Sequence, residues 1–381
     1  MNRAYISLGA NIGNCHKNIQ EAVIQIQKKI GILTDLSSLY VTPAWGFEGP
    51  NFLNACIGID TNDKPLKILE KLLDVEQAMG RERHTKTGYN SRFIDLDLLF
   101  YADQIINTSA LILPHPKIEF RNFIMHPLNE INPNIIHPTL KKTIADLLLV
   151  SSDKSKVKKL PMSDWSPMLF ETNRILILEG NIGVGKTLLA QKIADQYQVP
   201  FLKENFKENP FLEKFYNDSQ TYALSLENYF MKSRFRQFQE FINDKASSLK
   251  GVADHSLFRS LIFAKINLAS LDFHSFKKNY LAWSNKFYLP QKVIYLKHSV
   301  DKLRENIKIR GRDYEQKISK EYLTNIDLGY KLFFDLENEF PYCEIDLSDL
   351  DFVKDEAAYQ IILLRIKAFL AFGKNPTKLP H

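Results

Sequence analysis

Apolar positions in the first 150 residues alternate between two periods. Strand-like alternation covers residues 3–8, 32–41, 53–59 and 93–101. Helical spacing of three to four residues covers 19–30 and 66–73. The resulting order, β-α-β-β-α-β, predicts an α+β domain of the ferredoxin-like type over residues 1–150.

A polar stretch then interrupts the periodicity. Residues 151–173 hold four lysines within six positions, followed by Pro161 and Pro167, and show no sustained apolar pattern. This composition is typical of a linker, and a solvated lysine face is its simplest interpretation. We expect few contacts to cross it, so that the two halves separate near Val150.

Residues 174–381 show a second kind of layout. A short apolar strand at 174–179 runs into a glycine turn and a helix, and another apolar strand follows at 292–297. Long helical patterns between them predict an α/β domain with a parallel sheet. Near the C-terminus a helical apolar pattern predicts a core helix, with a homodimer interface as the alternative interpretation. Its members are Tyr359, Ile362, Ile366, Phe369 and Leu370.

Composition narrows the class of protein. The 381 residues are too many for one ordinary core, and 45% apolar with 25% charged residues is typical of a globular protein. No apolar stretch approaches the roughly 18 residues that span a bilayer, and the N-terminus breaks its apolar pattern too early for a secretory signal. Three distant cysteines outside any CxxC spacing indicate a reducing cytoplasm. A net charge of +6 suits small anionic substrates and predicts neither nucleic-acid nor membrane binding.

The strongest local signal in the first half is the pair Asp95 and Asp97. Residues two apart on a strand share one face and lie about 6.6 Å apart, so both carboxylates point the same way and suit Mg²⁺. An exposed polar strand face is the alternative for such a pair alone. Nearby cations favour a polyphosphate site, and with a titratable imidazole they comprise Arg81, Arg83, Arg92, Arg121 and His115.

Together with Ser7-Leu8-Gly9-Ala10-Asn11, Thr42-Pro43 and Phe52-Leu53-Asn54-Ala55, these residues resemble 6-hydroxymethyl-7,8-dihydropterin pyrophosphokinase over about residues 3–150. The resemblance implies that Asp95 and Asp97 hold two Mg²⁺ ions on the ATP phosphates. It implies a pterin site of Asn54, the backbone at Thr42 and Pro43, and the ring pair Phe52 and Phe123. It places Glu76 near substrate and nucleotide. It implies that ATP is bound, and the charge that develops during transfer is stabilised, by Arg81, Arg83, Arg92, Arg121 and His115. As alternatives, the two phenylalanines are plain core aromatics and His115 is a structural histidine.

In the second half, Gly180-Asn181-Ile182-Gly183-Val184-Gly185-Lys186-Thr187 fits GxxxxGK[ST] between a strand and a helix. In such a loop the backbone N–H groups cradle phosphates at the helix N-terminus. Lys186 then neutralises the phosphates and the Thr187 hydroxyl faces Mg²⁺. We therefore expect ATP and Mg²⁺ here as well.

The segment from about 174 to 340 resembles the deoxynucleoside kinase family. The motifs are Lys203-Glu204-Asn205, Phe211-Leu212-Glu213-Lys214-Phe215-Tyr216, Ala253-Asp254-His255-Ser256, Ile262-Phe263-Ala264-Lys265 and Arg310-Gly311-Arg312-Asp313-Tyr314-Glu315-Gln316. The resemblance implies Glu204 as general base on the sugar 5′-hydroxyl and Arg310 and Arg312 as lid arginines. It implies a substrate site of Tyr216, Glu227, Arg234, Asp254 and Glu315, in which Tyr216 and Glu315 bind the 3′-hydroxyl.

Four positions depart from that family pattern. The acidic-Arg-Ser motif reads Asp254-His255-Ser256 and lacks its arginine, and Ser260 replaces an acidic residue. Glu227 stands where many members have glutamine, and Asn306 where the lid often has arginine. The leading hypothesis is a bifunctional enzyme whose second half phosphorylates a purine deoxynucleoside. The alternatives are a degenerate nucleotide-binding or dimerisation module in the second half, and a non-catalytic binding module in the first.

Overall fold

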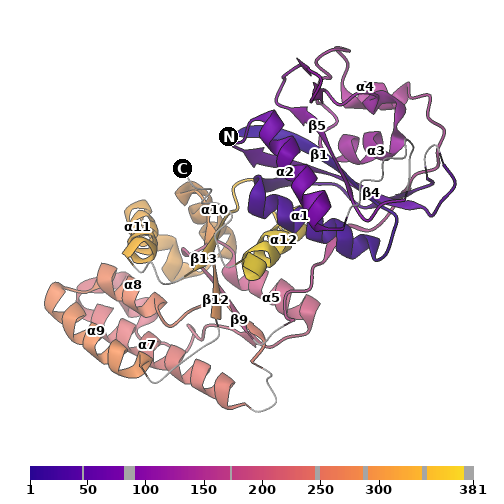
Figure 1. Cartoon of the computed structure of the whole chain (residues 1–381). Helices are drawn as coiled ribbons and strands as arrows, with labels where there is room; N and C mark the ends of the chain where they lie inside the picture. Colours follow the sequence, from indigo (N-terminus) through magenta and orange to yellow (C-terminus); the bar gives the residue numbers. More distant parts are fainter. Residues whose placement is uncertain are drawn as a thin grey trace. The chain divides into compact units, whose positions relative to one another are not determined.

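The computed structural model describes residues 1–44, 47–80, 91–171, 174–244, 249–285, 291–336 and 341–372. These residues form two compact units (Figure 1). The first contains Met1–Leu169 and Leu350–Phe372, and the second contains Phe170–Asp349. The first unit is therefore built from two separate stretches of chain.

The first unit has an antiparallel sheet in the order β5-β1-β4-β3-β8, with β2 also paired to β4. Its strands are β1 (Asn2–Ala10), β2 (Ile32–Leu36), β3 (Tyr40–Thr42), β4 (Phe52–Thr61), β5 (Asp95–Tyr101) and β8 (Lys158–Lys159). A separate hairpin joins β6 (Ile106–Asn107) to β7 (Ile112–Leu113). The predicted strand at 32–41 is thus two strands, since both β2 and β3 pair with β4.

Helices cover the sheet because their apolar stripes face it. The helices are α1 (Cys15–Lys29), α2 (Pro65–Ala78), η1 (Ile118–Phe120), α3 (Asn122–Ile131) and α4 (Ile144–Leu149). Residues of α3 and α4 form one core cluster with side chains of β1, β4 and β5. α1 begins where Asn14 accepts a hydrogen bond from the backbone N–H of Lys17, 3.0 Å long, a stabilising N-cap.

Most of the segment expected as a linker packs into the first unit. β8 pairs with β3, and η2 (Met162–Trp165) ends in a fully buried tryptophan. The Trp165 indole donates a 2.7 Å hydrogen bond to the carbonyl of Ser37. The unit therefore extends to Leu169 rather than ending near 150. The polar composition reflects an edge strand, whose exposed lysines carry no apolar period.

The first unit also includes the last described helix, α12 (Glu356–Phe372). α12 packs on α1, β2 and η2. Arg365 donates two hydrogen bonds to the carbonyl of Leu33, and Gln27 donates one to the carbonyl of Leu364. The members of the C-terminal apolar pattern from Tyr359 to Phe369 are at most 1% exposed, as expected of a core helix, so they offer no free face to a second copy.

The second unit contains the predicted parallel sheet, in the order β10-β11-β9-β12-β13. Its strands are β9 (Ile175–Gly180), β10 (Phe201–Leu202), β11 (Gly251–Ala253), β12 (Gln291–Lys297) and β13 (Tyr342–Asp346). Its helices are α5 (Lys186–Tyr197), α6 (Leu212–Asn217), α7 (Ser219–Asn243), α8 (Arg259–Asn267), α9 (Ser270–Ser284), α10 (Val300–Arg310), η3 (Asp313–Lys317) and α11 (Lys320–Leu336). Aromatic residues of α7, α8 and α11 pack against the sheet in one core cluster.

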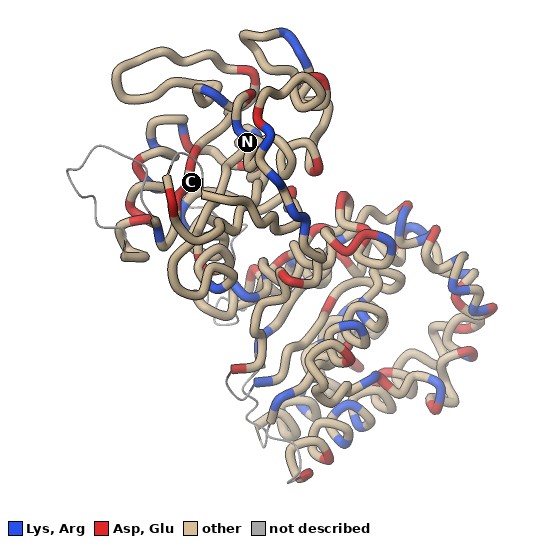
Figure 2. Tube along the Cα trace, turned by 90° about the vertical axis from the view of Figure 1, so that its right-hand side faces the viewer, with Lys and Arg blue, Asp and Glu red and all other residues tan. Residues whose placement is uncertain are grey.

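Acidic and basic residues are interspersed along the described chain instead of gathering on one segment (Figure 2). None of the described helices is both long and apolar enough to span a membrane. Because the charges are interspersed, a polyanionic ligand must be held by a local cluster of basic residues, and each unit contains such a cluster.

Candidate active sites

The first site lies where β1 and β5 run side by side. Their register sets Gly9 opposite Asp95 and Ser7 opposite Asp97, and these four residues line one pocket. Leu96, between the two aspartates, is buried on the other face of β5. The strand period thus brings both carboxylates to one face of the strand.

The carboxylates of this pocket are only partly neutralised by the protein. Arg92 forms an ion pair with Asp95, and the His115 imidazole lies 3.8 Å from Asp97. Burial and the neighbouring Asp95 raise the pKa of Asp97, although His115, Arg121 and Arg92 oppose the rise. Burial lowers the pKa of His115, so the imidazole is a weak counter-charge.

A divalent cation fits this environment. Adjacent carboxylate oxygens are the ligands that Mg²⁺ prefers, and Mg²⁺ usually completes its shell with water and substrate phosphates. Asp95 and Asp97 would hold the ion. Among the described residues no group of three or more His, Cys, Asp or Glu is placed to hold a metal ion.

The same pocket has an aromatic and amide side. Thr42, Pro43, Phe52, Asn54 and Phe123 all line it, as the pterin site requires. The Asn54 amide donates a 2.9 Å hydrogen bond to the Thr42 hydroxyl, which orients its Oδ1 toward Gly9. A Cβ at Gly9 would lie 3.1 Å from that oxygen, so glycine keeps this wall open.

Phe47 is a lining residue that sequence reasoning missed. Its ring meets Phe52 edge-to-face at 6.1 Å, a favourable geometry for an aromatic pair. Only its apolar character in a Gly-rich stretch, Gly46-Phe47-Glu48-Gly49, could have indicated it.

Two described residues expected in the first site, Glu76 and His115, do not line its pocket, although the His115 imidazole lies 3.8 Å from Asp97. Glu76 is buried beneath β5, where its Oε1 accepts a 2.8 Å hydrogen bond from the backbone N–H of Leu96. It therefore supports the strand between the two aspartates and does not line the pocket. Arg81 and Arg83 lie outside the described residues. Arg92 does line the pocket, and its backbone N–H donates a 2.6 Å hydrogen bond to the side chain of Asn11, the residue that follows β1.

The second site begins at the loop after β9. Gly180 and Gly183 have φ angles of 143° and 83°, and a Cβ there would lie 2.3 Å from the Leu296 carbonyl and 2.7 Å from the Leu303 carbonyl. Only glycine fits both positions. Gly185, at φ 100°, caps α5. The loop thereby presents its backbone at the N-terminus of α5, a geometry suited to phosphate.

Lys186 lies beneath this loop. Its Nζ donates hydrogen bonds of 2.8 Å and 2.7 Å to the carbonyls of Gly180 and Asn181. Burial and the neighbouring Arg259 lower the pKa of Lys186 to about 7. Asn306, where an arginine was expected, donates a 2.9 Å hydrogen bond to the Gly183 carbonyl and so holds the loop.

Asp254 connects the loop to the next strand end. Its Oδ2 accepts a 2.6 Å hydrogen bond from the Thr187 hydroxyl, and its Oδ1 accepts one of 2.7 Å from the backbone N–H of Glu204. Hydrogen bonds and His255 lower the pKa of Asp254 despite its burial, which alone would raise it. The Thr187 hydroxyl and the Asp254 carboxylate thus offer oxygen ligands beside the phosphate loop, a donor set that fits Mg²⁺.

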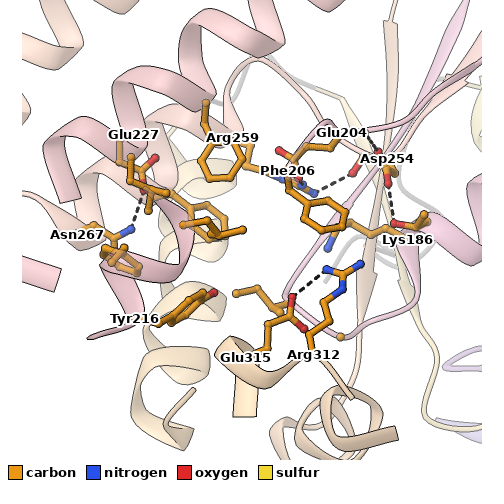
Figure 3. A pocket seen from close by; sticks show the side chains of 18 of the residues that line it. Lys186, Glu204, Phe206, Tyr216, Glu227, Asp254, Arg259, Asn267, Arg312 and Glu315 are labelled. Atoms are coloured by element: carbon orange, nitrogen blue, oxygen red, sulfur yellow. Dashed lines mark hydrogen bonds and ion pairs between the residues drawn. The ribbon is translucent and has the colours of Figure 1, made fainter. Parts of the chain in front are cut away.

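Glu204 is surrounded by cations. Arg234 lies 2.6 Å from its Oε1. Arg259 lies 2.9 Å from its Oε2, and both Arg259 and Glu204 are labelled in Figure 3. Burial would raise the pKa of Glu204, but Arg234 and Arg259 outweigh it and hold the pKa well below the ordinary value. The carboxylate therefore stays charged and can accept a hydrogen bond at any physiological pH.

Arg259 is the residue that sequence reasoning missed. It lines the pocket from the first position of α8, and it also lies 2.8 Å from the buried Glu179 at the end of β9. His255, which occupies the expected arginine position, instead packs its ring on Phe238 at 5.2 Å and does not line the pocket. The arginine absent from the motif is thus supplied four residues later, a signal visible in the sequence only once α8 is known to begin there.

The remaining expected residues meet around the same pocket. Arg310 and Arg312 both form ion pairs with Glu315, and Arg312 lies 4.0 Å over the ring of Phe206. Tyr216 stacks on Tyr314 at 5.9 Å. Glu227 lines the end of the pocket away from Lys186, beside Asn267 (Figure 3).

Each unit thus has the charge arrangement of an enzyme that transfers phosphoryl groups from a nucleotide. Family comparison agrees and is specific for each half. Residues 5–133 match the model for 7,8-dihydro-6-hydroxymethylpterin-pyrophosphokinase (HPPK), and residues 176–371 match the model for deoxynucleoside kinase. The chain belongs to both families, one in each half, so both resemblances drawn from the sequence are confirmed.

Individual relatives support each half. The 2-amino-4-hydroxy-6-hydroxymethyldihydropteridine pyrophosphokinase of Aquifex aeolicus is 38% identical over 147 residues, which cover 38% of this chain and 90% of the relative. The deoxyguanosine kinase of Bacillus subtilis is 28% identical over 204 residues, covering 52% of this chain and 99% of the relative. The deoxyadenosine kinase of Dictyostelium discoideum is 32% identical over 216 residues, covering 53% and 86%.

Proposed function

We propose that the first unit transfers the pyrophosphoryl group of ATP to 6-hydroxymethyl-7,8-dihydropterin and releases AMP, a step of folate synthesis. The observation that carries the proposal is one pocket lined both by Asp95 and Asp97 and by Asn54 with three phenylalanine rings. Bound Mg²⁺ would neutralise the phosphates and polarise the β-phosphorus. Phe52 and Phe123 would hold the ring, and Asn54 would orient its polar edge.

Within this reaction the protein supplies position and counter-charge. Arg92 and Arg121 line the pocket beside the aspartates, where they stabilise charge that builds up on the transferred group. Attack by the pterin hydroxymethyl oxygen needs little covalent help, because phosphoryl transfer passes through a loose transition state. Glu76 is a positioning residue through its hydrogen bond to Leu96.

For the second unit, the proposed reaction is phosphorylation of the 5′-hydroxyl of a purine deoxynucleoside by ATP and Mg²⁺. The supporting observation is the charged Glu204, which lies in the same pocket as Lys186 and the lid arginines. Glu204 would accept the hydrogen bond of the sugar hydroxyl, and the proton would pass to it as the bond to phosphorus forms. Tyr216 and Glu315 would bind the 3′-hydroxyl. The purine assignment is supported by the names of the relatives, a deoxyguanosine kinase and a deoxyadenosine kinase.

Two finer assignments belong to the same proposal. The first unit is ferredoxin-like, supported by the order β1-α1-β2-β3-β4-α2-β5, in which β2 and β3 together take the place of one strand, and by the antiparallel sheet in which β1 lies between β5 and β4. The enzyme works in a reducing cytoplasm, supported by three cysteines that are far apart in the chain and of which two are buried.

A paired assay on the full-length protein tests both activities. AMP should form from ATP when hydroxymethyl-dihydropterin is the sole acceptor, and ADP should form when a purine deoxynucleoside is the sole acceptor. AMP formation without any deoxynucleoside turnover would leave the second unit as a nucleotide-binding module. Absence of AMP formation would reject the first assignment.

A further inference from the structure

One buried carboxylate in the second unit has an unused acceptor. Glu227 on α7 is 1% exposed, and its Oε1 accepts a 2.7 Å hydrogen bond from the Asn267 amide of α8. Its Oε2 has no hydrogen-bond partner among the described residues. A buried acceptor left unpaired costs free energy, so this oxygen points to a ligand that donates to it.

The residues around Glu227 indicate which part of a ligand would lie beside it. Figure 3 shows Glu227 and Asn267 on the opposite side of the pocket from Lys186 and Asp254. The wall near Glu227 includes the apolar and aromatic residues Leu226, Phe230 and Tyr322. A nucleoside with its 5′-hydroxyl at Glu204 therefore extends its base toward Glu227.

The arginine closest to this end does not neutralise Glu227. Arg234, on the same helix, donates to Glu204 through Nε and Nη2 and to the Ser260 hydroxyl through Nη1. Glu227 therefore keeps two acceptor positions, the unpaired Oε2 and the second lone pair of Oε1, whose first accepts from Asn267. A carboxylate accepts hydrogen bonds at both oxygens and donates none.

We infer that Glu227 makes guanine the preferred base of the second unit, by accepting hydrogen bonds from the guanine N1–H and 2-amino groups. These two donors are adjacent on the guanine edge and match a carboxylate in bidentate fashion, which is the strong form of such a contact. Adenine and cytosine each present one donor beside one acceptor, so the carboxylate repels their ring nitrogen. The inference rests on the proposed kinase activity of this unit.

The charge of Glu227 links base choice to pH. Burial raises the pKa of Glu227 to about 7, opposed by Arg234 and by the Asn267 hydrogen bond. Arg234 of α7, Glu204 after β10 and Tyr322 of α11 are the titratable groups that face it. Glu204 has a pKa well below its ordinary value and Tyr322 one well above, so between pH 6 and 8.5 Glu204 stays ionised and Tyr322 stays neutral. Below its pKa, the neutral Glu227 donates as well as accepts, and adenine and cytosine gain relative to guanine.

The test measures kcat/KM of the full-length protein for deoxyguanosine, deoxyinosine, deoxyadenosine and deoxycytidine at pH 6 and 8.5. At pH 8.5 we expect deoxyguanosine to exceed deoxyadenosine about 5- to 150-fold, the range of one bidentate base contact. Deoxyinosine, which lacks the 2-amino donor, should fall between them. Glu227→Gln, whose amide donates and accepts, should reverse the preference and make it independent of pH. Glu240→Gln, an exposed change on the same helix, is the matched control and should change nothing.

The outcomes separate this inference from the kinase proposal. An unchanged ratio of deoxyguanosine to deoxyadenosine in Glu227→Gln, with turnover retained, overturns the role of Glu227 and leaves the kinase standing. If no deoxynucleoside is phosphorylated, the kinase proposal fails, and calorimetric binding of deoxyguanosine and deoxyadenosine decides the question. Tighter deoxyguanosine binding that is lost in Glu227→Gln supports the role of Glu227, and equal binding of the two nucleosides overturns it.

Discussion

The two units bring carboxylates to a nucleotide in opposite electrostatic states. In the first, Asp95 is paired with Arg92, while burial and the neighbouring Asp95 raise the pKa of Asp97 against the effect of His115, Arg121 and Arg92. In the second, Glu204 lies between Arg234 and Arg259, which hold its pKa well below the ordinary value. An added cation would therefore favour the charged form of Asp97, whereas Glu204 is compensated by the protein itself.

This difference distinguishes two roles of acidic residues that look the same in the sequence. A carboxylate that repels its neighbour gains most from a metal ion, and it contributes by binding that ion. A carboxylate held by two arginines keeps its charge and contributes by accepting a hydrogen bond from a hydroxyl group. The two environments therefore favour different partners, a cation beside Asp97 and a hydroxyl donor beside Glu204.

Truncating the chain to isolate the first site should have the strongest effect on the protein. A chain ending at Val150 lacks the buried Trp165 and all of α12. Fully burying a large apolar side chain is worth about 1.5–3 kcal/mol, so losing Trp165, Ile362 and Ile366 alone removes much of a typical total stability of about 5–15 kcal/mol. We expect no cooperative unfolding transition by calorimetry for residues 1–150.

The control for that truncation is a chain carrying residues 1–171 followed by 350–372 on a flexible linker. It should regain a cooperative transition and AMP formation with the pterin. A well-folded, active 1–150 fragment would show instead that the first unit does not need α12. Full-length protein with Lys186→Ala is the alternative route to measure the first site alone.

The metal-ligand role of the first pair predicts the next largest effect. Asp95→Ala or Asp97→Ala should lower AMP formation from ATP and pterin about 1,000-fold or more, since a Lewis acid contributes several kcal/mol and each 1.36 kcal/mol is tenfold in rate. Asp103→Ala, an exposed change just after β5, should leave the rate unchanged. Near-normal turnover of the two variants at saturating Mg²⁺ would remove the metal role and, with it, the contrast between the sites.

For the compensated carboxylate, Glu204→Gln should lower kcat for deoxynucleoside phosphorylation about 100- to 10,000-fold, the usual share of general base catalysis. ATP binding should persist, because the phosphate loop and Lys186 are untouched. Glu208→Gln, an exposed carboxylate four residues later, serves as control. Pre-steady-state kinetics would measure the phosphorylation rate, and calorimetry would measure ATP binding. A parallel loss of the rate and of ATP binding would mean that Glu204 stabilises the fold and is not specific to the chemical step.

Local geometry explains which parts could be predicted from the sequence. The loop from Gly180 to Thr187 was predictable because its glycines are required by positive φ angles and by close contacts with neighbouring backbone. The shared face of Asp95 and Asp97 follows in the same way from the period of one strand. The parallel sheet follows from strands that alternate with helices in the second unit.

Features that depend on distant partners could not be predicted. The apolar pattern of α12 predicts a core helix, but periodicity does not say which core it joins, and α12 packs on α1 and β2 of the first unit. Family similarity does not resolve this either, because the deoxynucleoside kinase match includes residues up to 371. Arg259 was missed for a related reason, since its partners Glu179 and Glu204 lie 80 and 55 residues earlier in the chain.

ATP binding should also change the number of protons bound at each site, with opposite signs at the two sites. Burial lowers the pKa of Lys186 to about 7, so at pH 8 about 0.9 of this group is neutral before ATP binds. Bound phosphates favour the charged form and raise that pKa, so ATP binding at the second site should take up nearly one proton at pH 8. The first site should show the opposite sign toward acidic pH, because a cation displaces the proton that the raised pKa leaves on Asp97.

Calorimetric titration of ATP in two buffers of different ionisation enthalpy measures the number of protons taken up or released. Lys186→Arg keeps the charge but has no proton to gain, so its uptake at pH 8 should fall to near zero. Equal uptake in both proteins would show that Lys186 is already charged, and that the second site, like Glu204 within it, is fully ionised before its nucleotide arrives.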